Sequence, residues 1–273
     1  MKIDAHQHFW HYHPERHPWI TPQMSVLQRD WLPEHLRPEL AAAGLDACIA
    51  VQADSSERET HFLLDLALDN PEIAGVVGWA DLTSGNIGDR LEHFAQFEKL
   101  KGFRHIAQSE PDDCFLVRDD FLRGISSLEA FSFTYDILIY PKQLPAAAEL
   151  VRRFPRQPFV IDHLAKPSIK TGEMEPWKAL MRKVAENDNV FCKLSGMVTE
   201  ASWTDWTSAD FLPYLDVVFE AFGPARLMFG SDWPVCLLAG SYAKVKQIIA
   251  GYASSDHDQL FGLTASRFYG LRA

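Results

Sequence analysis

Short runs of apolar and β-branched residues recur along the whole chain, and segments with helical spacing of apolar residues lie between them. Runs without polar–apolar alternation are typical of strands buried on both faces, as in a parallel sheet. We expect eight strands, over residues 3–9, 47–53, 73–82, 101–105, 133–140, 159–164, 190–194 and 227–231.

The intervening segments predict helices, several of which end at a glycine or a proline such as Gly44 or Pro71. Regular alternation of eight strands with helices predicts a (β/α)₈ TIM barrel, formed by a single domain over residues 1–273. The alternative is an open doubly wound sheet, but the chain lacks the glycine-rich phosphate loops of that class. The expected helices span residues 33–43, 57–70, 86–100, 118–130, 141–154, 173–187, 208–222, 241–252 and 256–269.

One long irregular segment, residues 10–32, separates the first strand from the first helix and is rich in histidine and tryptophan. Its aromatic content argues against disorder. In a barrel this loop lies at the carboxyl end of the strands, where active sites form. We expect it to wall or cover the pocket. Because loops carry little core burial, we expect its shortening to reduce turnover more than folding.

Composition narrows the classes of partner. The 273 residues include 26 Lys and Arg against 37 Asp and Glu, a formal net charge of −11, and the chain has no basic run. This balance disfavours nucleic acid as a partner. No apolar run is long enough to cross a membrane, and residues 1–4 contain no apolar region, so we expect no signal peptide. Four widely spaced cysteines form no CxxC motif and suit a reducing cytoplasm.

The strongest chemical signal is His6-Gln7-His8 at the end of the first strand. Alternation along a strand places both imidazoles on one side, where they suit a divalent metal or the polarisation of a carbonyl group. The alternative is a pair of hydrogen-bonded core histidines. A second signal is Asp232, after the last strand in GSDWP, which could equally cap a helix.

Three further residues lie at or near the ends of strands. His163 follows the sixth strand, and the alternative to a site role is an ordinary core or surface histidine. Arg104 ends the fourth strand and could bind an oxygen or form a salt bridge to a strand-end carboxylate. Lys193, on the seventh strand, is either a buried ion-pair member or a substrate ligand. All five signals are predicted to meet at one end of the barrel.

The segments IDAHQHFW, HPWI, DWLPEHL, VQA, GFRH, DHLAKP, CKLSG and GSDWP follow one another in barrel order. In these segments the chain resembles the amidohydrolase superfamily. The resemblance is greatest to the superfamily's branch of sugar-lactone hydrolases, or lactonases, which are grouped with predicted metal-dependent TIM-barrel hydrolases. The resemblance implies site residues on strands one, six and eight, which are His6, His8, His163 and Asp232.

The chain departs from the superfamily pattern on strands four and five. The usual pattern has a Lys or Glu on strand four and a His on strand five, where this chain has Arg104 with His105 and a strand without histidine. Asp136 is a poor replacement. We therefore expect no two-metal centre. Two alternatives stay open: a single divalent metal, zinc first, held by His6, His8, His163 and Asp232, or no metal.

The resemblance implies hydrolysis of an aldonolactone such as L-fucono- or L-rhamnono-lactone to the sugar acid. Asp232 is expected to act as the general base, with the three histidines and Arg104 polarising the carbonyl group. Substrate contacts are expected from His105, Lys193, Trp79 and Trp233. The alternatives are a metal-dependent decarboxylase of the same superfamily and a non-catalytic barrel that binds a sugar or an acid.

Overall fold

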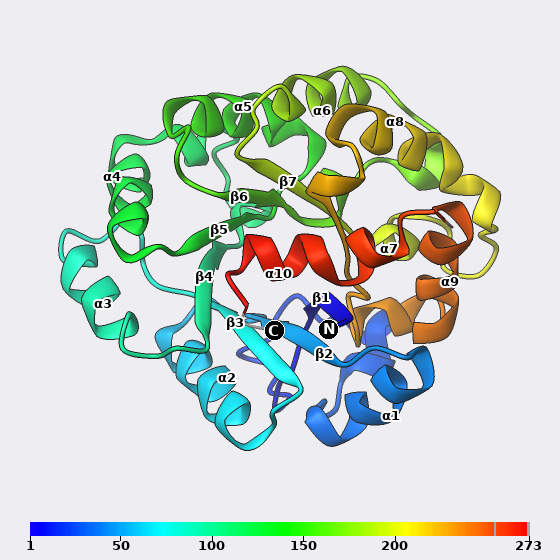
Figure 1. The fold of residues 1–273 in the computed structure, drawn as a ribbon, viewed down its shortest axis with the longest axis horizontal. Coiled ribbons are helices and arrows are strands. Elements are labelled where there is room, and N and C mark those ends of the chain that lie inside the picture. The colour runs from blue at the N-terminus through cyan, green and yellow to red at the C-terminus, as the bar shows by residue number, and fades with distance from the viewer. Residues whose placement is uncertain (254, 272–273) are drawn as a thin grey trace.

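In the computed structural model, which describes residues 1–253 and 255–271, eight parallel strands form one sheet in sequence order. The last strand returns to the first through a parallel bridge between Gln7 and Trp233, and the Asp232 amide donates to the His6 carbonyl at 2.8 Å. The predicted (β/α)₈ barrel is confirmed (Figure 1). The strands are β1 Ile3–Gln7, β2 Ala47–Val51, β3 Ile73–Gly78, β4 Leu100–His105, β5 Thr134–Ile137, β6 Phe159–Ile161, β7 Val190–Leu194 and β8 Leu227–Phe229.

The helices surround the barrel. Ser56 caps α2 by accepting from the Glu59 amide at 3.2 Å, and Gly44 ends α1 in the left-handed region at φ 64°. The predicted helix over 86–100 is too long, because Leu100 already begins β4. The helices are α1 Pro33–Ala43, α2 Glu57–Asp69, α3 Ile87–Phe94, α4 Asp119–Leu128, α5 Leu144–Arg153, α6 Trp177–Ala185, α7 Met197–Glu200, α8 Leu212–Phe222, α9 Tyr242–Tyr252 and α10 Thr264–Phe268.

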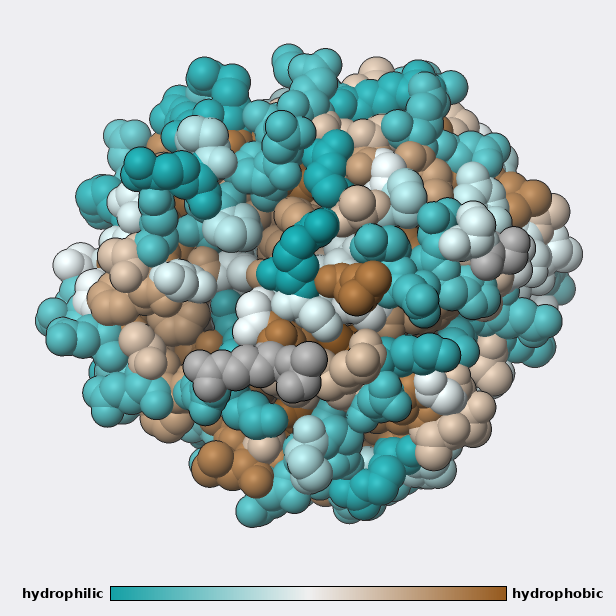
Figure 2. Space-filling model, viewed as in Figure 1, coloured by the Kyte–Doolittle hydropathy of each residue, from teal (hydrophilic) through white to brown (hydrophobic). Residues whose placement is uncertain are grey.

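Helix α10 lies across the amino end of the barrel, beside the start of β1 (Figure 1). Phe268 and Tyr269 pack there in an apolar cluster with Ile3 and Ala5. The space-filling view of this face is mostly hydrophilic, with smaller hydrophobic patches between the polar residues (Figure 2). The predicted site residues lie at the carboxyl ends of the parallel strands. They therefore face the side of the molecule opposite to α10.

The segment over 10–32 has two roles. Four of its residues line the pocket that also contains His8, His163 and Asp232; they are Glu15, Arg16, Pro18 and Trp19. The prediction that this loop walls the pocket is therefore confirmed.

The expectation that the same loop carries little core burial is wrong. Trp10, Leu27 and Trp31 are buried, and the Trp31 ring lies 5.0 Å from that of Trp233. Shortening the whole loop would remove core packing as well as a wall of the pocket.

Cys48, Cys192 and Cys236 are buried free thiols, whereas Cys114 is exposed. Across residues 1–253 and 255–271, no helix combines the length and apolar character needed to span a membrane.

Candidate active site

His6 of β1 and His8, which directly follows β1, point into one site. His8 Nδ1 lies 2.7 Å from the Val51 carbonyl oxygen, which can only accept, so Nδ1 carries the proton and Nε2 of the neutral ring is an acceptor. His6 Nε2 lies 3.2 Å from His8 Nε2. On its other side, His6 Nδ1 faces Asp162 at 3.3 Å and Lys193 at 3.1 Å. Burial lowers the pKa of His6 well below its ordinary value.

The two residues that follow β7 position the third histidine, His163. His163 Nδ1 lies 2.9 Å from Ser195 Oγ. Gly196 is required beside it, because a Cβ there would lie 2.5 Å from His163 Nδ1, and its φ of 61° also favours glycine. Burial lowers the pKa of His163 to about 4, against the opposing attraction of Asp232, so the ring is neutral at pH 7.

Asp232 stands where the three histidines meet. Its Oδ1 lies 3.4 Å from His8 Nε2 and 3.9 Å from the Nε2 atoms of His6 and His163. Burial raises the pKa of Asp232, but at acid pH, where the rings are protonated, attraction to His163 and a hydrogen bond from His8 outweigh that effect and hold the pKa below its usual range. Among the hydrogen bonds of the described residues, none joins this carboxylate to a backbone amide, so the helix-cap interpretation is not supported.

The donor set fits one divalent metal ion. A tetrahedral zinc site with bonds of about 2.0–2.2 Å places its ligand atoms about 3.3–3.6 Å apart. Among His6 Nε2, His8 Nε2 and Asp232 Oδ1, the separations are 3.2, 3.4 and 3.9 Å, and all three residues are buried. The other nitrogen of His8 bonds a carbonyl oxygen, the arrangement that typically orients a ligating histidine.

A buried charge network lies beneath this cluster. Asp162 accepts a hydrogen bond from Arg104 at 3.0 Å and forms an ion pair with Lys193 at 3.1 Å. Lys193 also pairs with Asp136, which in turn accepts from Tyr269 at 2.9 Å. Arg104 therefore forms the strand-end salt bridge that the sequence left as an alternative, and Lys193 is the buried ion-pair member.

This network argues against a second metal. Asp136, the replacement considered for strand five, has its Oδ2 occupied by Lys193 and Tyr269 below the cluster. On β4, where the usual pattern has a Lys or Glu, Arg104 offers N–H donors and no lone pair for a metal ion.

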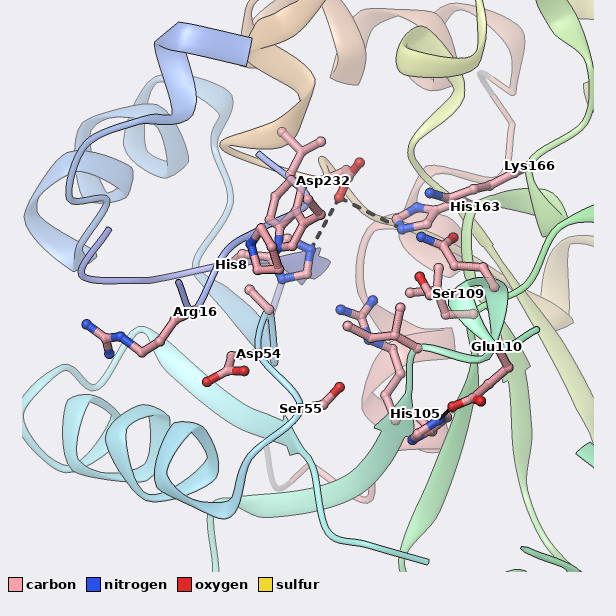
Figure 3. Close-up of a pocket in the computed structure, with 18 of the residues that line it drawn as sticks. His8, Arg16, Asp54, Ser55, His105, Ser109, Glu110, His163, Lys166 and Asp232 are labelled. Carbon is pink, nitrogen blue, oxygen red and sulfur yellow. Dashed lines mark hydrogen bonds and ion pairs between the residues drawn. The ribbon is translucent and has the colours of Figure 1, made fainter. Parts of the chain in front are cut away.

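The cluster opens into a cavity of about 510 Å³. Figure 3 shows Asp232 between His8 and His163 at one end of this pocket, with Asp54, Ser55, His105 and Glu110 toward the other end. Hydroxyl, carboxylate and imidazole groups of this kind suit a ligand rich in hydroxyl groups. The lining residues are His8, Glu15, Arg16, Pro18, Trp19, Ala53, Asp54, Ser55, Arg104, His105, Ile106, Gln108, Ser109, Glu110, Leu138, His163, Lys166, Asp232 and Val235.

Of the four expected substrate contacts, His105 lines the pocket, where its Nε2 pairs with Glu110 at 2.7 Å. Trp79 lies behind it and donates from Nε1 to His105 Nδ1 at 3.2 Å. Trp233 packs in the core, and Lys193 is fully buried. The structure therefore places Trp79, Trp233 and Lys193 outside the lining, and we assign them no direct contact with substrate.

Sequence reasoning gave no role to several residues that shape the site. Asp162, Ser195 and Gly196 position the histidines, and Glu110 pairs with His105. Their positions in the sequence could have indicated these roles. Asp162 directly precedes His163, and Ser195-Gly196 end the CKLSG segment that contains Lys193.

One wall of the pocket depends on a buried carboxyl group. Glu59 of α2 is 5% exposed and accepts from the amide of the wall residue Ala53 at 3.2 Å. Burial raises the pKa of Glu59 to about 7, although the bond from Ala53 opposes this shift. In the unfolded chain the pKa is near the ordinary 4.5. The folded state therefore disfavours ionisation, and stability is lost as the pH rises from about 4.5 through 7.

We expect Glu59→Gln to remove this pH dependence. The unfolding free energy of the variant minus that of wild type should rise by about 2–3 kcal/mol from pH 5 to pH 8. Urea denaturation at both pH values measures the difference. Glu57→Gln, on the same helix at the surface, is the control and should show no comparable gain. Parallel pH profiles for wild type and Glu59→Gln would contradict the account.

Fold and site together define a barrel hydrolase whose chemistry lies at the carboxyl ends of the strands. The model of the amidohydrolase family matches residues 3–271, and the chain belongs to this family.

Two relatives match almost the full length of the chain. An L-fucono-1,5-lactonase of Burkholderia multivorans is 43% identical over 99% of this chain and 96% of that protein. An L-fucono-1,5-lactonase of Burkholderia ambifaria is 36% identical over the same shares of the two chains. A crystal structure of an amidohydrolase from B. multivorans with bound zinc matches all of both chains with a TM-score of 0.94 and 42% identity.

Proposed function

We propose that this protein hydrolyses an aldonolactone to its aldonate, with L-fucono-1,5-lactone as the first substrate to test. The observation that carries the proposal is the convergence of three imidazole Nε2 atoms on the Asp232 carboxylate beside a polar pocket. The full-length similarity to L-fucono-1,5-lactonases supports the same substrate class.

In this proposal Asp232 is the general base. Its lowered pKa keeps it ionised at neutral pH, so it can accept a proton from a water molecule that attacks the lactone carbonyl carbon. The ring C–O bond then breaks, the ring oxygen takes up a proton, and the acyl carbon leaves as a carboxylate. General-base assistance of this kind contributes about 10²–10⁴-fold to the rate.

The remaining site residues act on the carbonyl oxygen and on the substrate hydroxyl groups. Arg104 and His163 provide N–H groups near the developing oxyanion, and His6 and His8 line the same end of the site. At the far end of the pocket, His105 and its neighbours Glu110, Ser109, Asp54 and Ser55 offer donors and acceptors to ring hydroxyls.

A single zinc ion would be held by His6, His8 and Asp232, with His163 beside them. When bound, it supplies a Lewis acid at the carbonyl end of the pocket. The zinc-containing relative supports this choice of metal. A cytoplasmic location stays a prediction from the sequence.

A lactone panel tests the proposal. L-fucono-1,5-lactone, L-rhamnono-1,4-lactone and D-glucono-1,5-lactone are incubated with the protein in a pH-indicator assay, before and after chelation and with zinc restored. We expect proton release well above the enzyme-free rate for at least one lactone, without carbon dioxide. A panel hydrolysed only at the enzyme-free rate would contradict the proposal. An aromatic carboxylic acid is added to the panel as a fourth compound, and release of carbon dioxide from it would favour the decarboxylase. Binding of a lactone without turnover would favour the non-catalytic barrel.

A further inference from the structure

The chain forms a left-handed turn after β6. His163, Leu164, Ala165 and Lys166 have φ values of 54°, 53°, 57° and 51°, and none of them is glycine. Such a conformation costs about 1–2 kcal/mol per residue in an L-amino-acid chain. The turn is held by the Lys166 amide donating to the His163 carbonyl at 2.7 Å, and by Trp177 Nε1 donating to the Leu164 carbonyl at 2.7 Å. Strain of this kind clusters at functional sites.

The turn brings two side chains to the same wall. With three residues per turn, side chains three positions apart lie on one side, and this holds for either hand. His163 and Lys166 both line the pocket, and Figure 3 shows Lys166 beside His163, close to Asp232.

The Lys166 ammonium group lies near a carboxylate and an aromatic ring but forms a hydrogen bond with neither. Its carboxylate neighbour is Glu200 at the end of α7, whose Oε1 lies 3.9 Å from Nζ, beyond hydrogen-bond distance. The Tyr140 ring lies 5.5 Å from Nζ. Within residues 1–253 and 255–271, no hydrogen bond from Lys166 Nζ is present, so its N–H groups remain able to bind a ligand.

The other cations near the cluster are differently placed. Arg104 donates to Asp162 and to Gln52, and Lys193 is buried between Asp136 and Asp162. Arg16 lines the pocket but in Figure 3 extends away from Asp232. Lys166 is therefore the cation best placed to meet an anion that forms next to the Asp232 carboxylate.

We infer that Lys166 Nζ binds the carbonyl oxygen of the substrate, with Glu200 as its positioning residue. The inference rests on the proposed lactone hydrolysis. The same oxygen is neutral in the lactone, an oxyanion in the tetrahedral intermediate and a carboxylate oxygen in the product. A charge-assisted hydrogen bond from Lys166 strengthens as this negative charge develops, which is the requirement for catalysis. It also offsets the repulsion between the product carboxylate and Asp232.

The test compares binding of two product-like molecules to wild type and Lys166→Met. Calorimetry gives the Kd of the aldonate and of the corresponding uncharged alditol. We expect Lys166→Met to weaken aldonate binding by about 10- to 100-fold and to lower kcat/KM by a similar factor. The Kd of the alditol should change less than about threefold, because the alditol lacks the charge that Lys166 meets. Lys166→Gln gives the same comparison should methionine disturb the turn.

The control is Lys170→Met, an exposed lysine four residues further on, which should leave both Kd values unchanged. Unchanged aldonate binding by Lys166→Met, or equal losses for aldonate and alditol, would overturn the inference while leaving the proposed function intact. A wild-type protein that neither binds the aldonate nor hydrolyses the lactone would overturn both.

Discussion

We expect Asp232→Asn to lower the turnover of the aldonolactone by about 10²–10⁴-fold, with the fold and the binding of aldonate largely retained. The amide is almost isosteric with the carboxylate, but it cannot accept the proton of the attacking water. The loss should appear in kcat and kcat/KM together, since the interaction is made in the transition state.

Steady-state kinetics with matched thermal unfolding measure this effect. Asp89→Asn, an exposed carboxylate on α3, serves as the control and should keep wild-type kinetics. Metal content is measured for each variant, because Asp232 is also a candidate ligand. Near-wild-type turnover by Asp232→Asn would remove Asp232 as the base.

The second large effect is on stability. Asp162→Asn should lower the unfolding free energy by about 3–5 kcal/mol, the usual cost of removing one partner from a buried charge network. The carboxylate of Asp162 forms ion pairs with Arg104 at 3.0 Å and Lys193 at 3.1 Å, and it lies 3.3 Å from His6 Nδ1. Without it, Lys193 keeps its ion pair with Asp136, whereas Arg104 loses its ion pair with Asp162.

A double-mutant cycle identifies the cause. Lys193→Met in the Asp162→Asn background removes one of the two cations that Asp162 neutralises, so the double variant should be less destabilised than the two single effects add up to. Chemical denaturation of the four proteins provides the cycle. Strict additivity, or a loss below about 1 kcal/mol for Asp162→Asn, would show that the network is not energetically coupled.

The barrel could be predicted from the sequence because its strands are buried on both faces and therefore form continuous apolar runs. The ends of elements were harder to predict. Phe97 and Leu100 extend the helical spacing of the third helix, yet Leu100 belongs to β4, since the chain must enter the sheet beside β3. Local spacing does not contain that tertiary constraint.

The histidines and Asp232 could be recognised because each follows or ends a strand, and all strand ends of a parallel barrel meet at one face. Alternation along a strand gives the inward direction of a side chain but not its depth in the barrel. Lys193 points inward, as expected, but it lies beneath the pocket, where it pairs with Asp136 and Asp162.

The left-handed turn from His163 to Lys166 could not be predicted either. Leucine, alanine and lysine disfavour positive φ, so local preferences point away from the observed conformation. Tertiary contacts such as the bond from Trp177 to the Leu164 carbonyl hold it in place. The position of Lys166 therefore emerges only from the folded structure.

The most direct test of general-base hydrolysis is a single turnover in H₂¹⁸O with protein in excess of L-fucono-1,5-lactone. If Asp232 activates water, one ¹⁸O atom appears in the carboxylate of the aldonate, faster than in an enzyme-free solution, and none appears in the protein. Mass spectrometry of the product and of the peptide containing Asp232 reads both positions. Label in the Asp232 side chain would reveal a covalent acyl intermediate, and label in the released hydroxyl group would place the attack away from the carbonyl carbon. Either result would contradict the mechanism.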